Sequence, residues 1–442
     1  MKKICFLDTY ACGDHDAEFQ QLMKNLDDTY THTIFPGDAD VIVAYFCAVT
    51  SSTISKTALE LVHISKAKKP DAIFIVAGCI VNALGKDYFL SLDYVDYAIY
   101  RDNFVQDVLD ILVQRKAEKE YFLGKNNVRF SINIVGGCVR KGGYCSFCKQ
   151  NYLCVPVKSL PIDEVLEIAN EVTKSPSIRV IRLTGLNTCN YGIDIGDKKQ
   201  KLHVLIQELS KLEKVKLIEV HALTIGDMYE ELADEIASNP KVRFISFGTQ
   251  SGSNEMLKIM NTHYTVEQIQ YYLDKFSHKA VYTIVVPGHP GETEETMQTT
   301  IDFIKRNKLW HIHISPFMNT FGTPSYSMEQ LPKEKYNAYV NMVVATVNEL
   351  RKDFLEYFTN NMVEAYFRGY SYNERKNTAH ISAYPQNFHG TLDCYIENPS
   401  DSEVCELAKK LQTGDKIKVH ITGFDEVHSS EPSLLFDKLE VI

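Results

Sequence analysis

The sequence lacks the features that would place the chain in a membrane or on a secretory route. Its longest apolar runs, such as Val41–Val49, are far too short to span a bilayer. The N-terminal segment MKKICFLDTYACGD reaches Asp8 before any long apolar stretch develops, so it does not resemble a signal peptide. The chain also has no internal repeat and no low-complexity segment. We therefore expect a cytoplasmic protein that makes no contact with a membrane.

An excess of basic charge is also missing. The 442 residues include 47 Lys or Arg and 57 Asp or Glu, which gives a formal net charge of -10 and a pI of about 5.8. A general cationic surface for nucleic acid is therefore absent, although these totals are compatible with a local basic patch. Hydrophobic residues make up 45% and charged residues 24%, which is typical of a globular chain long enough for two or three domains.

Three patterns follow one another along the chain. Residues 1–125 alternate short apolar runs with helical patterns, which predicts an open parallel α/β sheet. Residues 126–360 continue with six strand–helix units, which predicts a partial (β/α)6 barrel. Residues 361–442 differ, because short β-like runs surround one helical pattern there. We expect this last part to form a small β-rich domain.

Three cysteines lie in the segment GGCVRKGGYCSFCKQ and are called the barrel triad: Cys138, Cys145 and Cys148. They follow the first predicted barrel strand, at the end where such barrels place their active sites. Structural zinc prefers four protein ligands, whereas a cubane iron–sulfur cluster held by three thiolates leaves one iron open. An open iron that chelates an amine and a carboxylate is the arrangement that binds and cleaves S-adenosylmethionine. A C-x2-C pair alone is a weak signal, and zinc is its usual rival.

Three further cysteines lie at or just beyond the carboxyl ends of predicted strands and are called the N-terminal triad: Cys12, Cys47 and Cys79. Ligands bind at that edge in open α/β sheets. Small buried cysteines are common near strand ends, so any one of them has an ordinary explanation. The shared position of all three favours a single site with three thiolates. Eleven cysteines in a chain without an export signal indicate thiols and ligands rather than disulfides.

At this point the sequence resembles the radical S-adenosylmethionine methylthiotransferases over nearly its whole length. Three N-terminal segments are similar to the family's cysteine segments: DTYACGDHDAE, AYFCAVTSSTISKTA and VAGCIVNAL. Four later segments resemble its barrel motifs: LTGLNTCNYG, TQSGSNEMLKIMNTHYT, VVPGHPGETEE and FMNTFGTPSYSM. The order and spacing of these segments carry the resemblance.

The resemblance implies two [4Fe-4S] clusters, S-adenosylmethionine as cofactor and a TRAM-like domain at the C-terminus. A cluster on the barrel triad would cleave S-adenosylmethionine, and an auxiliary cluster on the N-terminal triad would hold the sulfur. One S-adenosylmethionine methylates that sulfur. A second yields the 5′-deoxyadenosyl radical, which removes hydrogen from an unactivated substrate carbon that then takes the methylthio group. An electron donor such as flavodoxin or ferredoxin and a sulfur donor are the implied partners.

Eight other residues are candidates for contacts with S-adenosylmethionine, although core packing and turn geometry are rival explanations. Apolar side chains suit the nucleoside, glycines allow close approach of the backbone, and short polar groups suit the amino acid or ribose. These residues are Phe147, Gly185, Asn187, Gln250, Ser251, Gly288, Phe317 and Met318. Cys189 is interpreted as a packed neutral thiol, and His311 and His313 as satisfied barrel residues.

The sequence departs from the family pattern in three places. The family usually spaces its barrel cysteines C-x3-C-x2-C, whereas this chain has C-x6-C-x2-C. The longer loop is basic and contains glycine, and it is either a spacer without a role or a contact for substrate. Ile259 and Thr262 replace arginines beside the Met-Asn dipeptide, and the segment HALTIGD contains no residue that we assign to the cofactor.

The substrate is the least determined part of the function. The family acts on adenosines of tRNA or on an aspartate of a ribosomal protein. Residues 386–442 hold eleven Asp or Glu and five Lys, a balance that repels phosphate and suits a basic polypeptide. We therefore expect a protein or peptide side chain as substrate, with a tRNA adenosine as the alternative. A radical enzyme that has lost sulfur insertion, or a zinc-bearing nucleic-acid-binding module, fits two cysteine triads less well.

Overall fold

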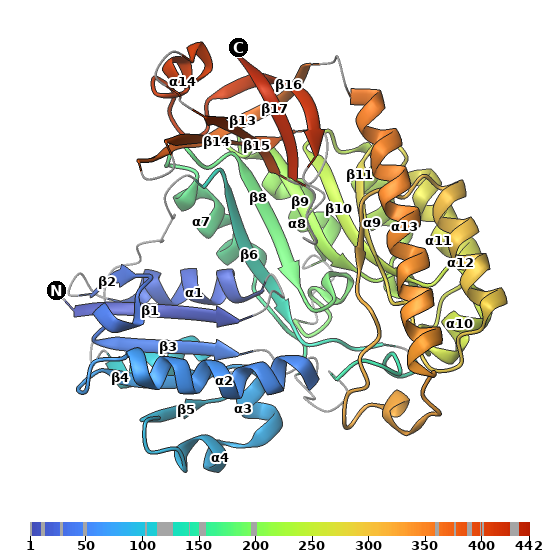
Figure 1. Cartoon of the computed structure of the whole chain (residues 1–442), viewed down its shortest axis with the longest axis horizontal. Coiled ribbons are helices and arrows are strands. Elements are labelled where there is room, and N and C mark those ends of the chain that lie inside the picture. The colour runs from blue at the N-terminus through green and yellow to red at the C-terminus, as the bar shows by residue number, and fades with distance from the viewer. Residues whose placement is uncertain are drawn as a thin grey trace.

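A computed structural model describes residues 2–9, 14–26, 30–46, 51–101, 104–112, 127–140, 142–149, 156–195, 201–358, 362–374, 377–386, 391–397, 399, 402–424 and 433–442. Three sheets follow one another along the chain (Figure 1). Both predicted domain boundaries, at 125/126 and 360/361, fall outside the described residues and stay predictions. None of the helices within the described ranges is long and apolar enough to cross a membrane.

The N-terminal sheet is parallel throughout, as the sequence predicts, with strand order β2-β1-β3-β4-β5. Its strands are β1 (Lys2–Thr9), β2 (Tyr30–Thr33), β3 (Val41–Phe46), β4 (Ile73–Ala77) and β5 (Tyr97–Ile99). Its helices are α1 (Asp14–Asn25), α2 (Ser51–Ala67), α3 (Cys79–Leu84), α4 (Lys86–Leu90) and α5 (Phe104–Leu112), with a 3-10 turn at Pro36–Asp38. Side chains of α1 and α5 pack on one face, and those of α2, α3 and α4 pack on the other. Burial on both faces explains the continuous apolar run of β3.

The middle sheet is open, with strand order β12-β11-β10-β9-β8-β6-β7. Six strands are parallel: β6 (Arg129–Gly136), β8 (Val180–Gly185), β9 (Leu217–Leu223), β10 (Val242–Gln250), β11 (Ala280–Val285) and β12 (Ile312–Ile314). The two-residue β7 (Lys158–Ser159) is antiparallel to β6. The helices are α7 (Ile162–Val172), α8 (Leu202–Lys211), α9 (Glu230–Ser238), α10 (Asn254–Ile259), α11 (Val266–Lys275), α12 (Glu294–Arg306) and α13 (Lys333–Phe358). Short 3-10 turns lie at Thr188–Asn190, Ile225–Asp227 and Pro324–Ser327. The predicted partial (β/α)6 barrel is confirmed.

The C-terminal strands form a closed barrel in the order β13-β14-β15-β17-β16. The strands are β13 (Met362–Asn373), β14 (Thr378–Pro385), β15 (Thr391–Glu397), β16 (Lys416–Phe424) and β17 (Ser433–Val441), with helix α14 (Glu403–Ala408) after β15. Only β15 and β17 pair in parallel, and the other pairs are antiparallel. The expected small β-rich domain is therefore present, and a five-stranded closed barrel of this kind resembles an OB-fold.

This C-terminal barrel sits against the amino ends of the middle sheet (Figure 1). Residues that begin or precede the parallel strands, Val128, Val180 and Leu217, form one buried cluster with Tyr366 and Tyr384 of the barrel. The carboxyl ends of the same strands lie at the opposite edge, because all six strands run in one direction. The C-terminal barrel therefore leaves that edge free for loops.

A buried ionic group reinforces the contact. Arg182 on β8 donates to Glu219 on β9 at 2.6 Å, and the Tyr384 hydroxyl donates to the other oxygen of Glu219. The Arg129 guanidinium lies 5.5 Å from the centroid of the Tyr384 ring. Burial alone would raise the pKa of Glu219, but the Arg182 charge and its neighbours hold that pKa well below its usual range. The carboxylate thus connects the middle sheet to the C-terminal barrel.

Replacement of Glu219 by Gln is expected to lower the free energy of unfolding by about 3–5 kcal/mol, because Arg182 and Arg129, whose guanidiniums lie 2.6 Å and 3.9 Å from Glu219, would lose their buried counter-charge. Chemical denaturation measures this change. Glu230→Gln is the control, since Glu230 is exposed and pairs with Lys275 at the surface. Equal denaturation midpoints for the two variants would contradict the role assigned to Glu219.

Candidate functional site

The N-terminal triad follows three neighbouring strands of the first sheet. Cys79 begins α3, two residues after β4 ends, and is buried. Cys12 and Cys47 lie outside the described residues, and in the sequence they follow the last residues of β1 and β3. Strands β1, β3 and β4 are adjacent and parallel, and the strand order reverses between β1 and β3. Ligands bind at the carboxyl edge beside such a reversal in open α/β sheets.

Arg101 lies beside Cys79. Its guanidinium donates to the Cys79 sulfur at 3.7 Å and pairs with Glu18 of α1 at 3.5 Å. The Arg101 side chain is only 5% exposed, so a cation is held next to this thiol away from bulk water. Sequence reasoning missed Arg101, because it lies 22 residues from Cys79 and no motif marks it.

The barrel triad lies on a loop that begins where β6 ends, and residues 137–140 and 142–148 of this loop form no helix or strand. Cys148 N–H donates to the Cys145 carbonyl at 3.0 Å, which closes a turn between these two cysteines. All three cysteines are half-buried. Segments that follow other strands hold this loop: Ser146 N–H donates to Met260 O at 2.8 Å, and Val139 N–H donates to Asn190 Oδ1 at 2.8 Å.

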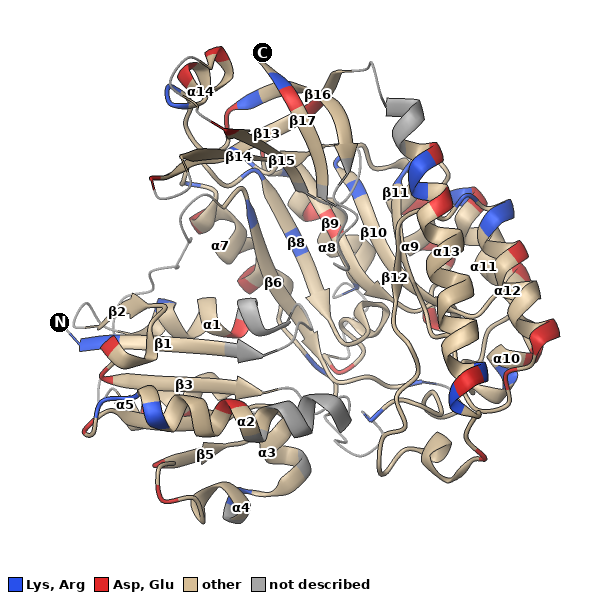
Figure 2. Ribbon diagram, in the orientation of Figure 1, with Lys and Arg blue, Asp and Glu red and all other residues tan. Residues whose placement is uncertain are grey.

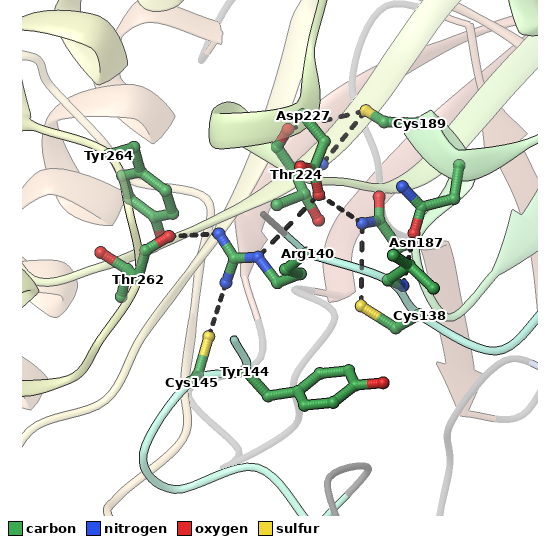
Figure 3. Close-up of polar contacts among 12 residues, drawn as sticks. Cys138, Arg140, Tyr144, Cys145, Asn187, Cys189, Thr224, Asp227, Thr262 and Tyr264 are labelled. Carbon is green, nitrogen blue, oxygen red and sulfur yellow. Dashed lines mark hydrogen bonds and ion pairs between the residues drawn. The ribbon is translucent and has the colours of Figure 1, made fainter. Parts of the chain in front are cut away.

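A chain of polar groups connects two of the triad sulfurs (Figure 3). Arg140 donates to the Cys145 sulfur at 2.7 Å and to the Thr262 carbonyl, and its Nε lies 3.9 Å from Asp227. Asn187 donates to Asp227 at 2.7 Å and reaches the Cys138 sulfur at 3.7 Å. Sequence reasoning missed both Arg140, in the lengthened loop, and Asp227, in the segment HALTIGD.

These contacts decide how well the barrel triad fits an iron–sulfur cluster. Burial raises the pKa of Cys138 and Cys145, whereas the Asn187 amide and the Arg140 charge favour the thiolate. Within the described ranges, no group of three or more His, Cys, Asp and Glu side chains is placed to hold one metal ion. A cubane differs from a single ion, because each thiolate binds a different iron. Three soft sulfur ligands with N–H donors to two of them fit such a cluster.

Two of the predicted cofactor residues carry buried oxygens without a hydrogen-bond partner among the described residues. They are Asn187 Oδ1, just beyond β8, and Gln250 Oε1, at the end of β10. Gln250 has a φ of 63°, a conformation that is uncommon for residues other than glycine. Unsatisfied buried oxygens fit a polar ligand, because leaving them unpaired is costly. Ser251, in contrast, bonds to Thr300 at 2.9 Å inside the fold.

Among the apolar and glycine residues predicted to contact the cofactor, some lie in an apolar group near the barrel triad and others are explained by packing within the protein. Phe147 and Phe317 lie in one apolar group with Met256, Met260 and Val286, whereas Met318 is half-buried outside that group. A Cβ on Gly185 would lie 2.6 Å from the Val135 carbonyl oxygen, and one on Gly288 would lie 2.5 Å from the Tyr336 ring. Protein packing therefore accounts for both glycines.

The remaining thiol and histidines of this sheet are packed. Cys189 accepts from Thr224 N–H at 3.4 Å, and burial raises its pKa to about 12, as expected of a neutral thiol. The rings of His311 and His313 both pack near the Tyr282 ring, with centroid distances of 4.7 Å and 6.4 Å. Burial lowers the pKa of His311 to about 3, so this ring is neutral near pH 7.

A cavity of about 290 Å³ is lined by residues of α1, α5 and β6. Its wall includes Arg101, which touches Cys79, and Gly136, two residues before Cys138. Lys158, Glu18 and Asn133 also line it, and Asn133 Oδ1 has no partner among the described residues. The cavity thus borders residues of both cysteine-bearing regions.

Comparison with known proteins gives two family matches and many relatives. Residues 132–304 match the radical SAM superfamily, and residues 4–99 match the uncharacterized protein family UPF0004. A tRNA-2-methylthio-N(6)-dimethylallyladenosine synthase of Aliarcobacter butzleri is 27% identical over 80% of this chain and 84% of its own length. The threonylcarbamoyladenosine tRNA methylthiotransferase MtaB of Bacillus subtilis is 28% identical over 76% and 78%. The ribosomal protein uS12 methylthiotransferase RimO of Carboxydothermus hydrogenoformans is 25% identical over 95% and 97%.

Replacement of Gly185 by Ala is expected to lower the free energy of unfolding by about 1–3 kcal/mol even without cofactor, because the new methyl group would push β8 away from β6. Gly136→Ala is the matched control at the end of the neighbouring strand, where the nearest atom to a Cβ is 4.0 Å away. Denaturation of the cofactor-free protein measures both variants. A loss of cofactor binding in Gly185→Ala without loss of stability would instead assign this glycine to the ligand.

Proposed function

The chain belongs to the radical S-adenosylmethionine methylthiotransferase family, and on that premise we propose that it uses two [4Fe-4S] clusters to convert a carbon–hydrogen bond of a polypeptide side chain into a methylthioether. The cavity between the two cysteine-bearing regions carries this proposal, because radical formation and sulfur transfer need neighbouring sites. When bound, the barrel cluster supplies the electron that cleaves S-adenosylmethionine, and the auxiliary cluster supplies the sulfur.

The chain's own residues have distinct roles in this proposal. Cys138, Cys145 and Cys148 hold the barrel cluster through thiolates, which Arg140 and Asn187 favour by donating to sulfur. The free oxygens of Asn187 and Gln250 accept from the polar groups of S-adenosylmethionine, and Phe147 and Phe317 offer an apolar surface to its nucleoside. Roles for Gly185, Ser251, Gly288 and Met318 have less support, because packing or internal bonds account for the first three.

The N-terminal triad holds the auxiliary cluster in the same proposal. Cys12, Cys47 and Cys79 follow three adjacent parallel strands, so their segments leave the same edge of the first sheet. Arg101 places a positive charge beside Cys79, which favours the thiolate form that a cluster requires. The reductant, a flavodoxin or ferredoxin, and the sulfur donor belong to the proposal on family grounds alone.

A polypeptide substrate is supported by the charge of the C-terminal barrel. Residues 362–442 contain thirteen Asp or Glu and eight Lys or Arg. Figure 2 shows acidic positions on α14 and on the strands of this barrel, and Glu397, Glu403 and Glu440 are exposed. A surface that grips phosphates gains affinity by neutralising them, so an acidic surface works against RNA and in favour of a cationic polypeptide.

A tRNA adenosine is the second candidate, and aromatic residues on the same barrel favour it. Tyr395 is 60% exposed and stacks on His380, with ring centroids 4.7 Å apart. Together with Tyr372 they line a hollow of about 800 Å³ formed by residues of β13, β14 and β15. OB-folds bind oligonucleotides on this face, and exposed aromatic rings stack on bases. The names of two of the three relatives above refer to tRNA.

Replacement of each cysteine triad by Ala is expected to abolish a different part of the activity. Loss of the barrel triad should stop formation of 5′-deoxyadenosine and leave about four irons per chain in place of about eight. Loss of the N-terminal triad should spare 5′-deoxyadenosine and stop methylthio transfer. Iron and sulfide analysis with product detection by mass spectrometry measures both. Loss of all iron from the first variant, or zinc in place of iron, would refute two separate clusters.

The two substrates are expected to respond to different changes on the C-terminal barrel. Replacement of Glu397, Glu403 and Glu440 by Lys should weaken binding of a lysine-rich peptide and strengthen binding of bulk tRNA at about 0.15 M salt, because attraction between charges becomes repulsion. Tyr395→Ala should leave peptide binding unchanged, but it should weaken tRNA binding about tenfold if the ring stacks on a base. Methylthioadenosine formed in tRNA by the wild-type enzyme would end the polypeptide hypothesis.

A further inference from the structure

The lengthened loop of the barrel triad carries Arg140, whose buried guanidinium lies among the cysteines. The Arg140 side chain is 6% exposed, and its guanidinium contacts the Cys145 sulfur, the Thr262 carbonyl and, at 3.9 Å, the Asp227 carboxylate (Figure 3). A spacer without a role would leave this side chain in solvent, and a substrate contact would direct it outward. Neither explanation of the longer loop fits the direction that Arg140 takes.

Arg140 is not needed to anchor the loop. The Asn261 amide donates to the Tyr144 carbonyl at 2.8 Å. Ser146 N–H donates to the Met260 carbonyl, and the Ser146 carbonyl accepts from the N–H and the hydroxyl of Ser325. These bonds already attach the loop to the segments after β10 and β12. The contact between the guanidinium and the sulfur therefore has a consequence other than holding the backbone in place.

The geometry of Arg140 is fixed from two sides. Asp227 partly balances the charge of the guanidinium and is itself held by the Asn187 amide at 2.7 Å. The Arg140 guanidinium also lies 5.7 Å from the centroid of the Tyr264 ring, which favours a cation over its face. Because these contacts already fix the Arg140 side chain, its hydrogen bond to the Cys145 sulfur costs no further side-chain conformational entropy. A lysine ammonium is a compact point charge and does not reproduce the fork that serves sulfur and carbonyl together.

A fixed N–H donor at a cluster thiolate changes the energy of the cluster. Reduction adds negative charge, and a cation or donor beside the sulfur stabilises the reduced state more than the oxidised state in a site that excludes water. Hydrogen bonds to the sulfurs are one of the terms that set the reduction potential of iron–sulfur clusters. The positive charge of Arg140 therefore makes the reduction potential of the cluster more positive, whereas the negative charge of Asp227 makes it more negative.

We propose that Arg140 is a positioning residue that donates to the Cys145 thiolate when the barrel cluster is bound and raises the reduction potential of that cluster. The proposal rests on the proposed function, because it requires Cys138, Cys145 and Cys148 to hold the cluster. The extra residues between Cys138 and Cys145 then supply an electrostatic element of the redox site.

The test measures the midpoint potential of the barrel cluster by EPR-monitored redox titration. The parent protein carries Ala at Cys12, Cys47 and Cys79, so that the signal comes from the barrel cluster alone. Arg140→Gln is expected to move the midpoint to a more negative potential, and Arg140→Lys is expected to move it less. Arg243→Gln is the matched control, because Arg243 is an exposed arginine on β10 and its loss should leave the midpoint unchanged.

Asp227→Asn is expected to shift the midpoint potential in the opposite direction from Arg140→Gln. It keeps the guanidinium and removes its counter-charge, so the midpoint should become more positive. An assembled cluster whose midpoint is the same in the parent, Arg140→Gln and Asp227→Asn would overturn the inference and leave the proposed function intact. If Arg140→Gln fails to assemble a cluster, an unchanged midpoint in Asp227→Asn overturns the inference. Absence of iron from the parent would instead remove the proposed function itself.

Discussion

The common direction of the strands is the constraint on which the candidate site depends. Parallel strands need a crossover helix after each strand, so every loop at one edge follows a carboxyl end. In the middle sheet this edge gathers residues that are far apart in the sequence: Cys138 after β6, Asn187 after β8, Asp227 after β9, Met260 after β10 and Ser325 after β12. In its described residues the loop of the barrel triad has no helix or strand, and backbone and side-chain groups from these neighbours form hydrogen bonds with several of its polar groups. Reversing β8, β9, β10 or β12 would remove a support from this loop.

The two ends of the middle sheet differ in whether their buried polar groups have hydrogen-bond partners. At the amino end, Glu219, Arg182 and Tyr384 satisfy one another, and the neutral His311 packs among aromatic rings. At the carboxyl end, Asn187 and Gln250 keep oxygens without a partner among the described residues. Satisfied networks stabilise a fold, whereas unsatisfied groups are tolerated where a ligand completes them. The sheet therefore separates the part that holds the C-terminal barrel from the part that is suited to bind small molecules.

The sequence alone predicts the long buried strands and the positions of the cysteines, because apolar runs and cysteine spacing are local signals. It misses β2, β5 and β7, which are short edge strands with little pattern to detect. It also misses β13 and β14 of the C-terminal barrel. In β13 a register shift between Phe367 and Gly369 interrupts the alternation that marks a strand. The role of Arg140 is not local either, since its direction depends on Asp227 and Thr262, 87 and 122 positions away in the sequence. Likewise, only the approach of Val135 distinguishes a packing role from a ligand role for Gly185.

The position of the C-terminal barrel has a consequence for catalytic efficiency. The barrel packs on the amino ends of the strands, and the cysteine loop lies beyond their carboxyl ends, so the two are separated by the length of the sheet. If the barrel binds the substrate, as the proposed function holds, that substrate must reach around the molecule to present its target atom. Binding energy gained at the distant point does not touch the reacting carbon, but it raises the effective concentration of that carbon at the radical source. With this arrangement, a large macromolecule of fixed shape is modified more efficiently than a short fragment around the modified residue, even when the fragment contains every atom that reacts.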